Sequence, residues 1–124
     1  MTINEVIRAA DRLKHNTHND EEKVAWLTRL DQMLVRTTIN SHVREEDMEL
    51  PHYDPDIDMD TELLAEAPHD EMYIYWLMAQ MDLANADFNQ YNADITIFNS
   101  LHEAYSADYT RHHIPKAAGA RFLF

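Results

Sequence analysis

The chain has 124 residues, one glycine, no cysteine and a formal net charge of −13. This length suits one domain, and the lack of cysteine excludes a disulfide scaffold, a thiolate zinc site and a cysteine nucleophile. The lone glycine, Gly119, excludes glycine-rich phosphate loops and argues against an all-β fold, whose tight turns need positive φ. No apolar run is long enough to span a membrane and the N-terminus does not resemble a signal peptide, so we expect a soluble intracellular protein.

Charge is distributed unevenly along the chain. Residues 45–110 contain 17 Asp or Glu and no Lys or Arg, so every lysine and arginine lies in residues 1–44 or 111–124. A block of this length without a cation cannot neutralise phosphates, which argues against ordinary DNA or RNA binding. The same block holds most of the aromatic residues, which argues against disorder.

Two helices are predicted near the N-terminus. Thr2 and Glu5 form the pattern of a capping box, and apolar residues at helical spacing follow, which predicts a helix over about 3–14. Asn19 and Glu22 repeat the capping signal, and the apolar spacing after them predicts a second helix over about 20–41. We expect the two helices to pack as an antiparallel pair.

Residues 44–68 break the helical pattern because prolines stand at positions 51, 55 and 68. Every second residue from 54 to 60 is an aspartate, which is typical of a strand, so we expect a short extended arm over residues 57–64. The whole segment is predicted to be a long, partly extended loop that projects from the domain. Long loops in small helical domains are usually functional or interfacial. The aspartates are Asp54, Asp56, Asp58 and Asp60.

Two further helices are predicted beyond this loop. The third begins just after Pro68, and its apolar residues cover two faces, which suggests that Tyr75 and Trp76 contact a neighbouring subunit. The fourth covers about 87–112 and carries eight residues at heptad spacing, typical of a packing seam. These are Phe88, Tyr91, Ile95, Phe98, His102, Tyr105, Tyr109 and His112.

Residues 117–124 are predicted to be a docking tail. The segment includes a basic residue followed by three large apolar ones, so we expect it to bind a partner surface. Its interface candidates are Arg121, Phe122, Leu123 and Phe124.

Patterns for metal binding and catalysis are weak. The aspartate run lacks the glycine and glutamate of a calcium-binding EF-hand, so it is interpreted as a solvated acidic edge, with an adventitious cation site as the alternative. The eight histidines form no zinc motif, and His102 is expected to be a partnered residue of the seam. Ser41 beside His42 is too common a pattern to indicate a hydrolase. We therefore expect no enzyme activity, no metal and no cofactor.

Several stretches resemble those of the small helical head–tail connector proteins of tailed bacteriophages, also called adaptor or head-completion proteins. They are TINEVI (2–7), DRLK (11–14), KVAWLTRLD (23–31), TELL (61–64), PHDEMYIYWLMAQMD (68–82) and RHHIPK (111–116). The likeness continues through the Asn, Tyr and Phe positions of residues 85–109 and so covers nearly the whole chain. It departs at Ala86, where the family has glycine, and in the loop before Tyr53, which contains glycine in the family.

The resemblance implies an all-α, four-helix adaptor domain over residues 1–116, with a projecting loop over 44–68 and the tail at 117–124. About twelve copies would form a ring beneath the portal protein in the virion neck, after assembly in the host cytoplasm, and would contact a tail or stopper protein. DNA would pass through without specific binding, since an acidic wall repels phosphate. Asp54, Asp56, Asp58 and Asp60 are then channel-lining candidates. Leu63 and Leu64 are interface candidates, expected to be buried only in the ring.

Two other classes of function remain open. An acidic inhibitor encoded by a phage would use the carboxylates of residues 45–110 to imitate DNA and occupy a host nucleic-acid enzyme. A carboxylate-rich, metal-dependent hydrolase is the weaker alternative, because no set of ligands in the sequence completes a metal site.

Overall fold

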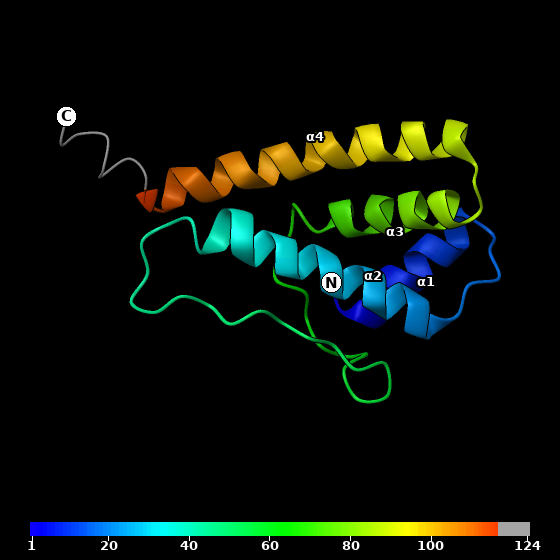
Figure 1. Ribbon diagram of the computed structural model, residues 1–124, viewed down its shortest axis with the longest axis horizontal. Coiled ribbons are helices and arrows are strands. Elements are labelled where there is room, and N and C mark those ends of the chain that lie inside the picture. The colour runs from blue at the N-terminus through cyan, green and yellow to red at the C-terminus, as the bar shows by residue number, and fades with distance from the viewer. Residues whose placement is uncertain (117–124) are drawn as a thin grey trace.

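The computed structural model describes residues 1–116, and this part of the chain contains four α-helices and no strand. They are α1 (Ile3–Leu13), α2 (Asp20–Leu34), α3 (Glu71–Ala84) and α4 (Phe88–His112). A π-helical turn, η1 (Val35–Ile39), continues α2, and a long loop then leads to α3 (Figure 1). The expected all-α class, with a long segment between the second and third helices, is confirmed.

The two predicted N-terminal caps are present. Thr2 Oγ1 accepts a hydrogen bond from the amide of Glu5, and the Glu5 carboxylate accepts one from the amide of Thr2. The Asn19 side chain accepts a hydrogen bond of 2.8 Å from the amide of Glu22. Side-chain oxygens at these positions satisfy amides that have no partner within the helix, which is why both helices begin where the sequence indicates.

The second helix is less regular than the sequence predicts. Its α-helical part ends at Leu34, and the amide of Asn40 reaches back to the carbonyl of Val35 at 2.8 Å, which widens the last turn. Within this region the Thr37 hydroxyl donates to the carbonyl of Met33 at 2.7 Å, and such back-bonding competes with the regular ladder.

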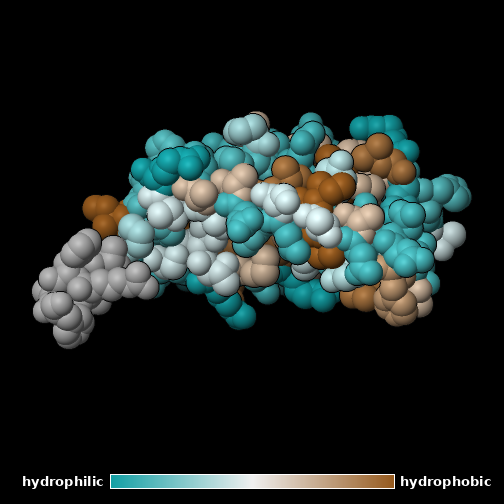
Figure 2. Space-filling model, turned by 90° about the horizontal axis from the view of Figure 1, so that it is seen from above, coloured by the Kyte–Doolittle hydropathy of each residue, from teal (hydrophilic) through white to brown (hydrophobic). Residues whose placement is uncertain are grey.

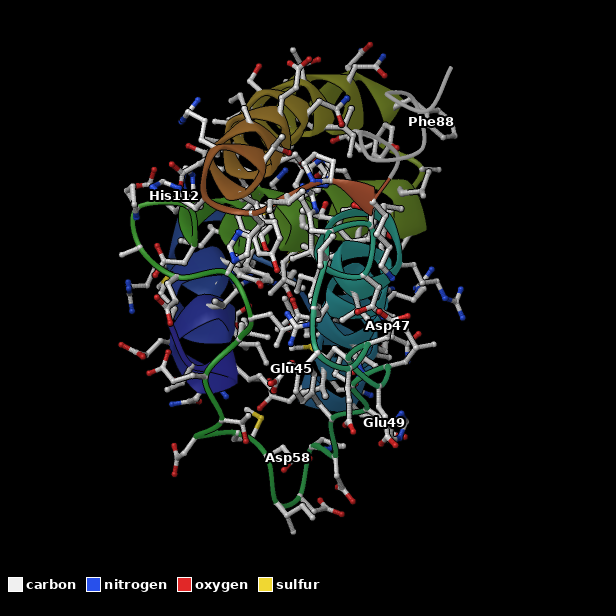
Figure 3. The ribbon with its side chains drawn as sticks, turned by 90° about the vertical axis from the view of Figure 1, so that its left-hand side faces the viewer. Glu45, Asp47, Glu49, Asp58, Phe88 and His112 are labelled. Atoms are coloured by element: carbon white, nitrogen blue, oxygen red, sulfur yellow. The ribbon has the colours of Figure 1, made fainter. Side chains whose placement is uncertain are left out.

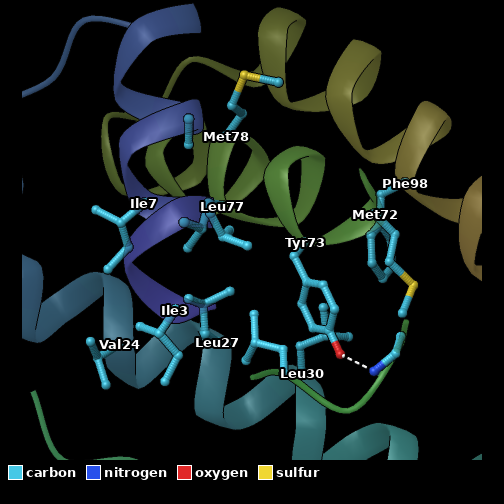
Figure 4. Close-up of a cluster of buried hydrophobic side chains, with 14 of the residues drawn as sticks. Ile3, Ile7, Val24, Leu27, Leu30, Met72, Tyr73, Leu77, Met78 and Phe98 are labelled. Atoms are coloured by element: carbon cyan, nitrogen blue, oxygen red, sulfur yellow. Dashed lines mark hydrogen bonds between the residues drawn. The ribbon is translucent and has the colours of Figure 1, made fainter. Parts of the chain in front are cut away.

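Helix α3 lies at the centre of the fold. Helix α4 covers one side of it, while α1 and α2, which run in opposite directions, contact its other side (Figure 1). Tyr73, Leu77 and Met81 of α3 are fully buried. Figure 4 shows side chains of α3 meeting Ile3 and Ile7 of α1 in the hydrophobic core.

This central position gives the two apolar faces of α3 partners within the same chain. Both faces are covered by helices of the same chain, so they do not require a neighbouring subunit. Trp76 donates from its indole nitrogen to the carbonyl of Trp26 at 2.8 Å, and its ring lies 5.1 Å from that of Phe98. Tyr75 is half-buried and packs against the core.

The seam predicted for α4 is confirmed in its middle part only. Phe98 and Tyr105 are buried against α3, but Phe88 is 61% exposed and His112 is also exposed. Helix α4 is longer than α3, so its C-terminal end, with His112, extends past the helix that it packs on (Figure 1).

The turn between α3 and α4 uses an unusual backbone conformation. Ala86 has φ of 56°, the left-handed region in which glycine is favoured. The amide of Asp87 donates to the carbonyl of Asp82 at 2.8 Å, and the Asp87 side chain caps α4. The structure therefore places a left-handed residue where the sequence departs from the glycine of the resembling family.

Candidate functional site

The long loop is fastened to the core by a buried carboxylate. Asp31 of α2 is fully buried and accepts hydrogen bonds from the hydroxyls of Tyr53 at 2.5 Å and Tyr73 at 2.6 Å, and from the amide of Leu64 at 3.2 Å. Burial raises the pKa of Asp31, and these three hydrogen bonds oppose the shift. Tyr53 and Leu64 belong to the loop, so the loop is held against the body of the domain at two points.

Leu63 is an integral part of the core. Its side chain is 3% exposed, and its amide donates to the carbonyl of Met1 at 3.1 Å. Residues 59–63 are held along the start of α1, where the amide of Ile3 donates to the carbonyl of Thr61. The expectation that Leu63 is buried only in a ring is therefore wrong, because the N-terminal segment already covers it. Leu64 is half-buried and keeps some exposed surface.

The alternating aspartates begin with a turn over residues 54–58, and the extended part of the expected arm is limited to an antiparallel bridge between Glu62 and Thr2. The amide of Asp58 donates to the carbonyl of Asp54 at 2.8 Å, and the amide of Asp54 donates to the Asp58 carboxylate at 2.7 Å. The Asp54 carboxylate accepts from the amide of Asp56 at 2.8 Å. Aspartate favours turns because its side chain accepts hydrogen bonds from nearby backbone amides, and proline favours them because its φ is fixed. The alternation of aspartates in the sequence suggests a strand instead. Asp58 lies at the tip of the loop, on the side of the molecule opposite α4 (Figure 3).

Most carboxylates of this loop have no cationic partner within residues 1–116. Asp47 pairs with Lys116 at 2.8 Å, and Glu62 pairs with the amino group of Met1 at 3.2 Å. Arg8 of α1 and Lys23 of α2 pair with Asp20 and Asp11, which lie outside the loop. The negative field of the loop is thus largely uncompensated. The carboxylates without such a partner there belong to Glu45, Glu46, Glu49, Asp54, Asp56, Asp58, Asp60 and Glu66.

A cleft separates the acidic loop from α2. Its apolar part, a cavity of about 410 Å³, lies between Val24, Ala25 and Thr28 of α2 and Tyr53 and Pro55 of the loop. It adjoins a more polar cavity of about 550 Å³ that shares the loop residues 52, 53 and 55. We name the two cavities together the α2–loop cleft, and its acidic rim consists of Asp20, Glu21, Asp54 and Asp56.

A second groove, of about 400 Å³, lies at the C-terminal end of α4. His69 Nε2 lies 3.2 Å from the Asp108 carboxylate there, and the rings of Tyr109 and His113 stack at 3.8 Å. The Ser41 hydroxyl near this groove donates to the carbonyl of Thr38 at 2.7 Å. His42 Nδ1 lies 3.1 Å from the Ser41 hydroxyl, but it also contacts the carbonyl of Thr38 at 2.5 Å, which makes this nitrogen a donor rather than a base toward Ser41.

The fourth helix presents a mixed outer face. Phe88 is 61% and Ile97 42% exposed, and Figure 2 shows hydrophobic residues over this face interrupted by hydrophilic ones. Scattered exposed apolar residues are normal on a protein surface and need no partner.

His102 packs within the seam, as expected, with its ring stacked on Phe98 at 5.6 Å. Its Nε2 is buried without a hydrogen-bond partner among residues 1–116, so the expected polar partner is not seen there. Burial lowers the pKa of His102, which favours the neutral ring.

A buried ion cluster links three helices and was not predicted from the sequence. The ammonium of Lys14 lies 2.5 Å from the Asp82 carboxylate and 2.7 Å from that of Asp94. Burial and the neighbouring Asp94 raise the pKa of Asp82 to about 6, against the influence of Lys14. The cluster joins the end of α1 to α3 and α4, which gives it a structural role.

Within residues 1–116, no group of three His, Asp or Glu side chains is arranged to hold a metal ion. No helix in that range is long and apolar enough to span a membrane. The tail candidates Arg121, Phe122, Leu123 and Phe124 lie outside the described residues.

Comparison of the chain with protein-family models, with curated proteins and with solved structures finds no match. A function for this chain is therefore inferred from its own sequence, geometry and charge.

Proposed function

We propose that this protein is a structural subunit of the neck of a tailed bacteriophage. About twelve copies form a ring beneath the portal, which extends the DNA channel and joins the head to the tail. The subunit works by assembly rather than catalysis. Its partners are further copies of itself, the portal protein, and a tail or stopper protein, and DNA passes without specific binding. It is located in the virion neck, after assembly in the host cytoplasm.

The observation that carries this proposal is the anchored acidic loop. Asp31 fixes the loop to the core through Tyr53 and Leu64, while the loop's outer carboxylates lack cationic partners within residues 1–116. A DNA channel needs a wall of fixed shape that does not hold phosphate, and such a surface meets both conditions. The turn that carries Asp54, Asp56, Asp58 and Asp60 is the part assigned to the channel wall.

The resemblance to head–tail connector proteins supports the same proposal, and the all-α fold with its long loop is the architecture that the resemblance implies. The ring contact draws on the surfaces that the monomer leaves accessible. Tyr75 and Leu64, both half-buried, remain candidates for that contact, as does the tail. Trp76 contributes to the monomer through its bond to Trp26, and Leu63 through the core.

The same uncompensated carboxylates favour a second candidate, an acidic inhibitor that imitates DNA. Its binding to a basic enzyme would depend on charge, whereas a ring depends mainly on buried apolar surface. The response of the complex to salt and to charge removal separates the two candidates.

Loss of the gene from the phage tests the proposed function. We expect DNA-filled heads and free tails to accumulate unjoined, and supply of the intact chain to restore joining. A phage that still produces normal tailed particles without the gene would contradict the proposal. A chain that remains with a host nucleic-acid enzyme, and is missing from purified particles, would favour the inhibitor.

A further inference from the structure

We propose that the α2–loop cleft binds the segment 117–124 of a second copy of this chain. The inference deepens the proposed function and rests on it, because it names the contact that joins neighbouring subunits of the ring. Each subunit would give its tail to one neighbour and receive the tail of another neighbour in its cleft, so the contact joins two different surfaces. Such a contact is heterologous, and it closes into a ring when the rotation between subunits allows.

The cleft combines an apolar floor with an acidic rim. Val24, Ala25 and Tyr53 line the floor, between α2 and the loop. On the rim, Glu21 and Asp56 have no Lys or Arg partner within residues 1–116, whereas Asp20 is paired with Arg8. Arg29 also lines the cleft, but it lies two helical turns along α2 from Glu21 and does not line the polar cavity that carries the rim. The rim around Glu21 and Asp56 therefore favours a positively charged ligand.

The tail has the matching composition. Residues 117–124 read AAGARFLF, with one arginine, no acidic residue and three large apolar residues in sequence. A guanidinium binds carboxylates with directed hydrogen bonds. A phenylalanine ring removes a large apolar area from water when it packs on an apolar floor. Arg121 on the rim with Phe122 on the floor satisfies both halves of the cleft.

The length of the tail indicates that Arg121 reaches the acidic rim near Glu21 from another molecule. The amide of Lys116 donates to the carbonyl of Ser41 at 2.9 Å, so the tail starts beside the end of η1. Figure 1 shows the C-terminal end of α4 at the same end of the molecule as the end of η1. Arg29, at the near end of the cleft, lies 12 residues before Ser41, about 18 Å along a helix, whereas Glu21 on the rim lies 20 residues before it, about 30 Å. Arg121 can extend only about 18 Å from Lys116, since an extended chain spans at most about 3.6 Å per residue.

Photocrosslinking in the full-length protein tests this inference. Benzoylphenylalanine replaces Phe122, and isotope-labelled and unlabelled copies are mixed at concentrations that include those used for particle assembly. We expect crosslinks from position 122 to residues 21–29 or 52–56, and we expect them to join labelled to unlabelled chains. The same reagent at Phe88, an exposed residue at the other end of α4, should give no crosslink to the cleft. Crosslinks from position 122 to another surface, within one chain only, or none at any concentration, overturn the inference.

Charge reversal supplies a second readout. Asp56→Arg should weaken self-association at least tenfold, because it places two guanidinium groups together, and combining it with Arg121→Glu should restore association. Asp60→Arg is the matched control, an exposed aspartate of the same loop that does not line the cleft. Equal effects at positions 56 and 60, or no rescue by the double change, overturn the inference. If the Asp56→Arg chain is nevertheless built into the neck normally, the inference fails while the proposed neck function stands.

Discussion

The hydroxyl of Tyr73, on α3, donates a hydrogen bond of 2.6 Å to the carboxylate of Asp31, on α2. The same oxygen accepts a hydrogen bond of 2.8 Å from the amide of Ala65, in the loop. One side chain therefore links two helices and the loop in a buried setting, where an unsatisfied polar group is costly. The acidic loop thus depends on the packing of the helices for its position.

Tyr73→Phe should lower the free energy of unfolding by about 2 kcal/mol. The change leaves the Asp31 carboxylate with one donor fewer and the amide of Ala65 without its acceptor. Urea unfolding of the unchanged protein and of the Tyr73→Phe variant measures the difference in free energy of unfolding. Tyr91→Phe is the control, since Tyr91 is half-exposed on α4 and away from this cluster. Equal stability of the two variants would show that the cluster contributes nothing.

Lys14→Met should destabilise the protein by about 3 kcal/mol at pH 7, since it leaves two buried carboxylates without their cation. The pKa of Asp82 in the folded protein is already raised from 3.8 to about 6, so the native state holds a proton more firmly than the unfolded state. The contribution of this group to stability is therefore greatest below about pH 4 and falls as pH rises toward 6.

Removing Lys14 raises this pKa further, so the loss of stability should be smaller at pH 5 than at pH 7. Thermal unfolding at both pH values measures it. Arg12→Met, at an exposed position of the same helix, is the control and should change stability little at either pH. A penalty for Lys14→Met that does not depend on pH would contradict this account of the cluster.

Ala86→Gly should stabilise the protein by about 0.5–1 kcal/mol. The backbone at this position has φ of 56°, which is unfavourable for alanine and free of strain for glycine, and this gain exceeds the entropy that glycine adds to the unfolded chain. Ala84→Gly, two residues earlier at the last position of α3, should instead destabilise by up to about 1 kcal/mol. Comparing the two melting temperatures checks the signs, and a loss of stability at both positions would exclude a left-handed residue 86.

Neck complexes that contain this protein should persist in about 0.5 M salt, where charges on the surface are screened beyond a few ångström. Changing Asp54, Asp56, Asp58 and Asp60 together to Asn should also leave assembly largely intact. Asparagine keeps the oxygen that accepts within the turn, Glu21 keeps a carboxylate on the rim of the α2–loop cleft, and the change introduces no repelling cation there. Sedimentation of purified complexes measures both effects. Dissociation in moderate salt, or on removal of the four charges, would favour the acidic inhibitor instead.

The helices and their caps could be predicted from the sequence because they depend on local signals. Thr2 with Glu5 and the helical spacing of α4 are patterns within one segment. The capping box and the helix are both found in the structure, and the seam on α4 is buried in its middle part. Asp31 also carried a signal, since it stands within the apolar spacing of Leu27, Leu30 and Leu34 and so had to be buried with partners.

The features that could not be predicted depend on contacts between distant segments. Leu63 is buried because residues 59–63 lie along the start of α1, and nothing in the neighbourhood of Leu63 indicates this pairing. The ion cluster joins Lys14 to residues 68 and 80 positions later in the chain. Two apolar faces on α3 indicate burial on both sides, but the sequence does not tell whether the same chain or another one covers them.

The measurement that tests the proposed function most directly is electron cryomicroscopy of the intact phage particles that encode this chain. We predict a ring of this all-α fold between the portal and the tail, with the turn of residues 54–58 facing the DNA channel and α4 directed away from it. Particles in which the density between portal and tail fits another protein, and in which this fold is found nowhere in the neck, would contradict the proposed function.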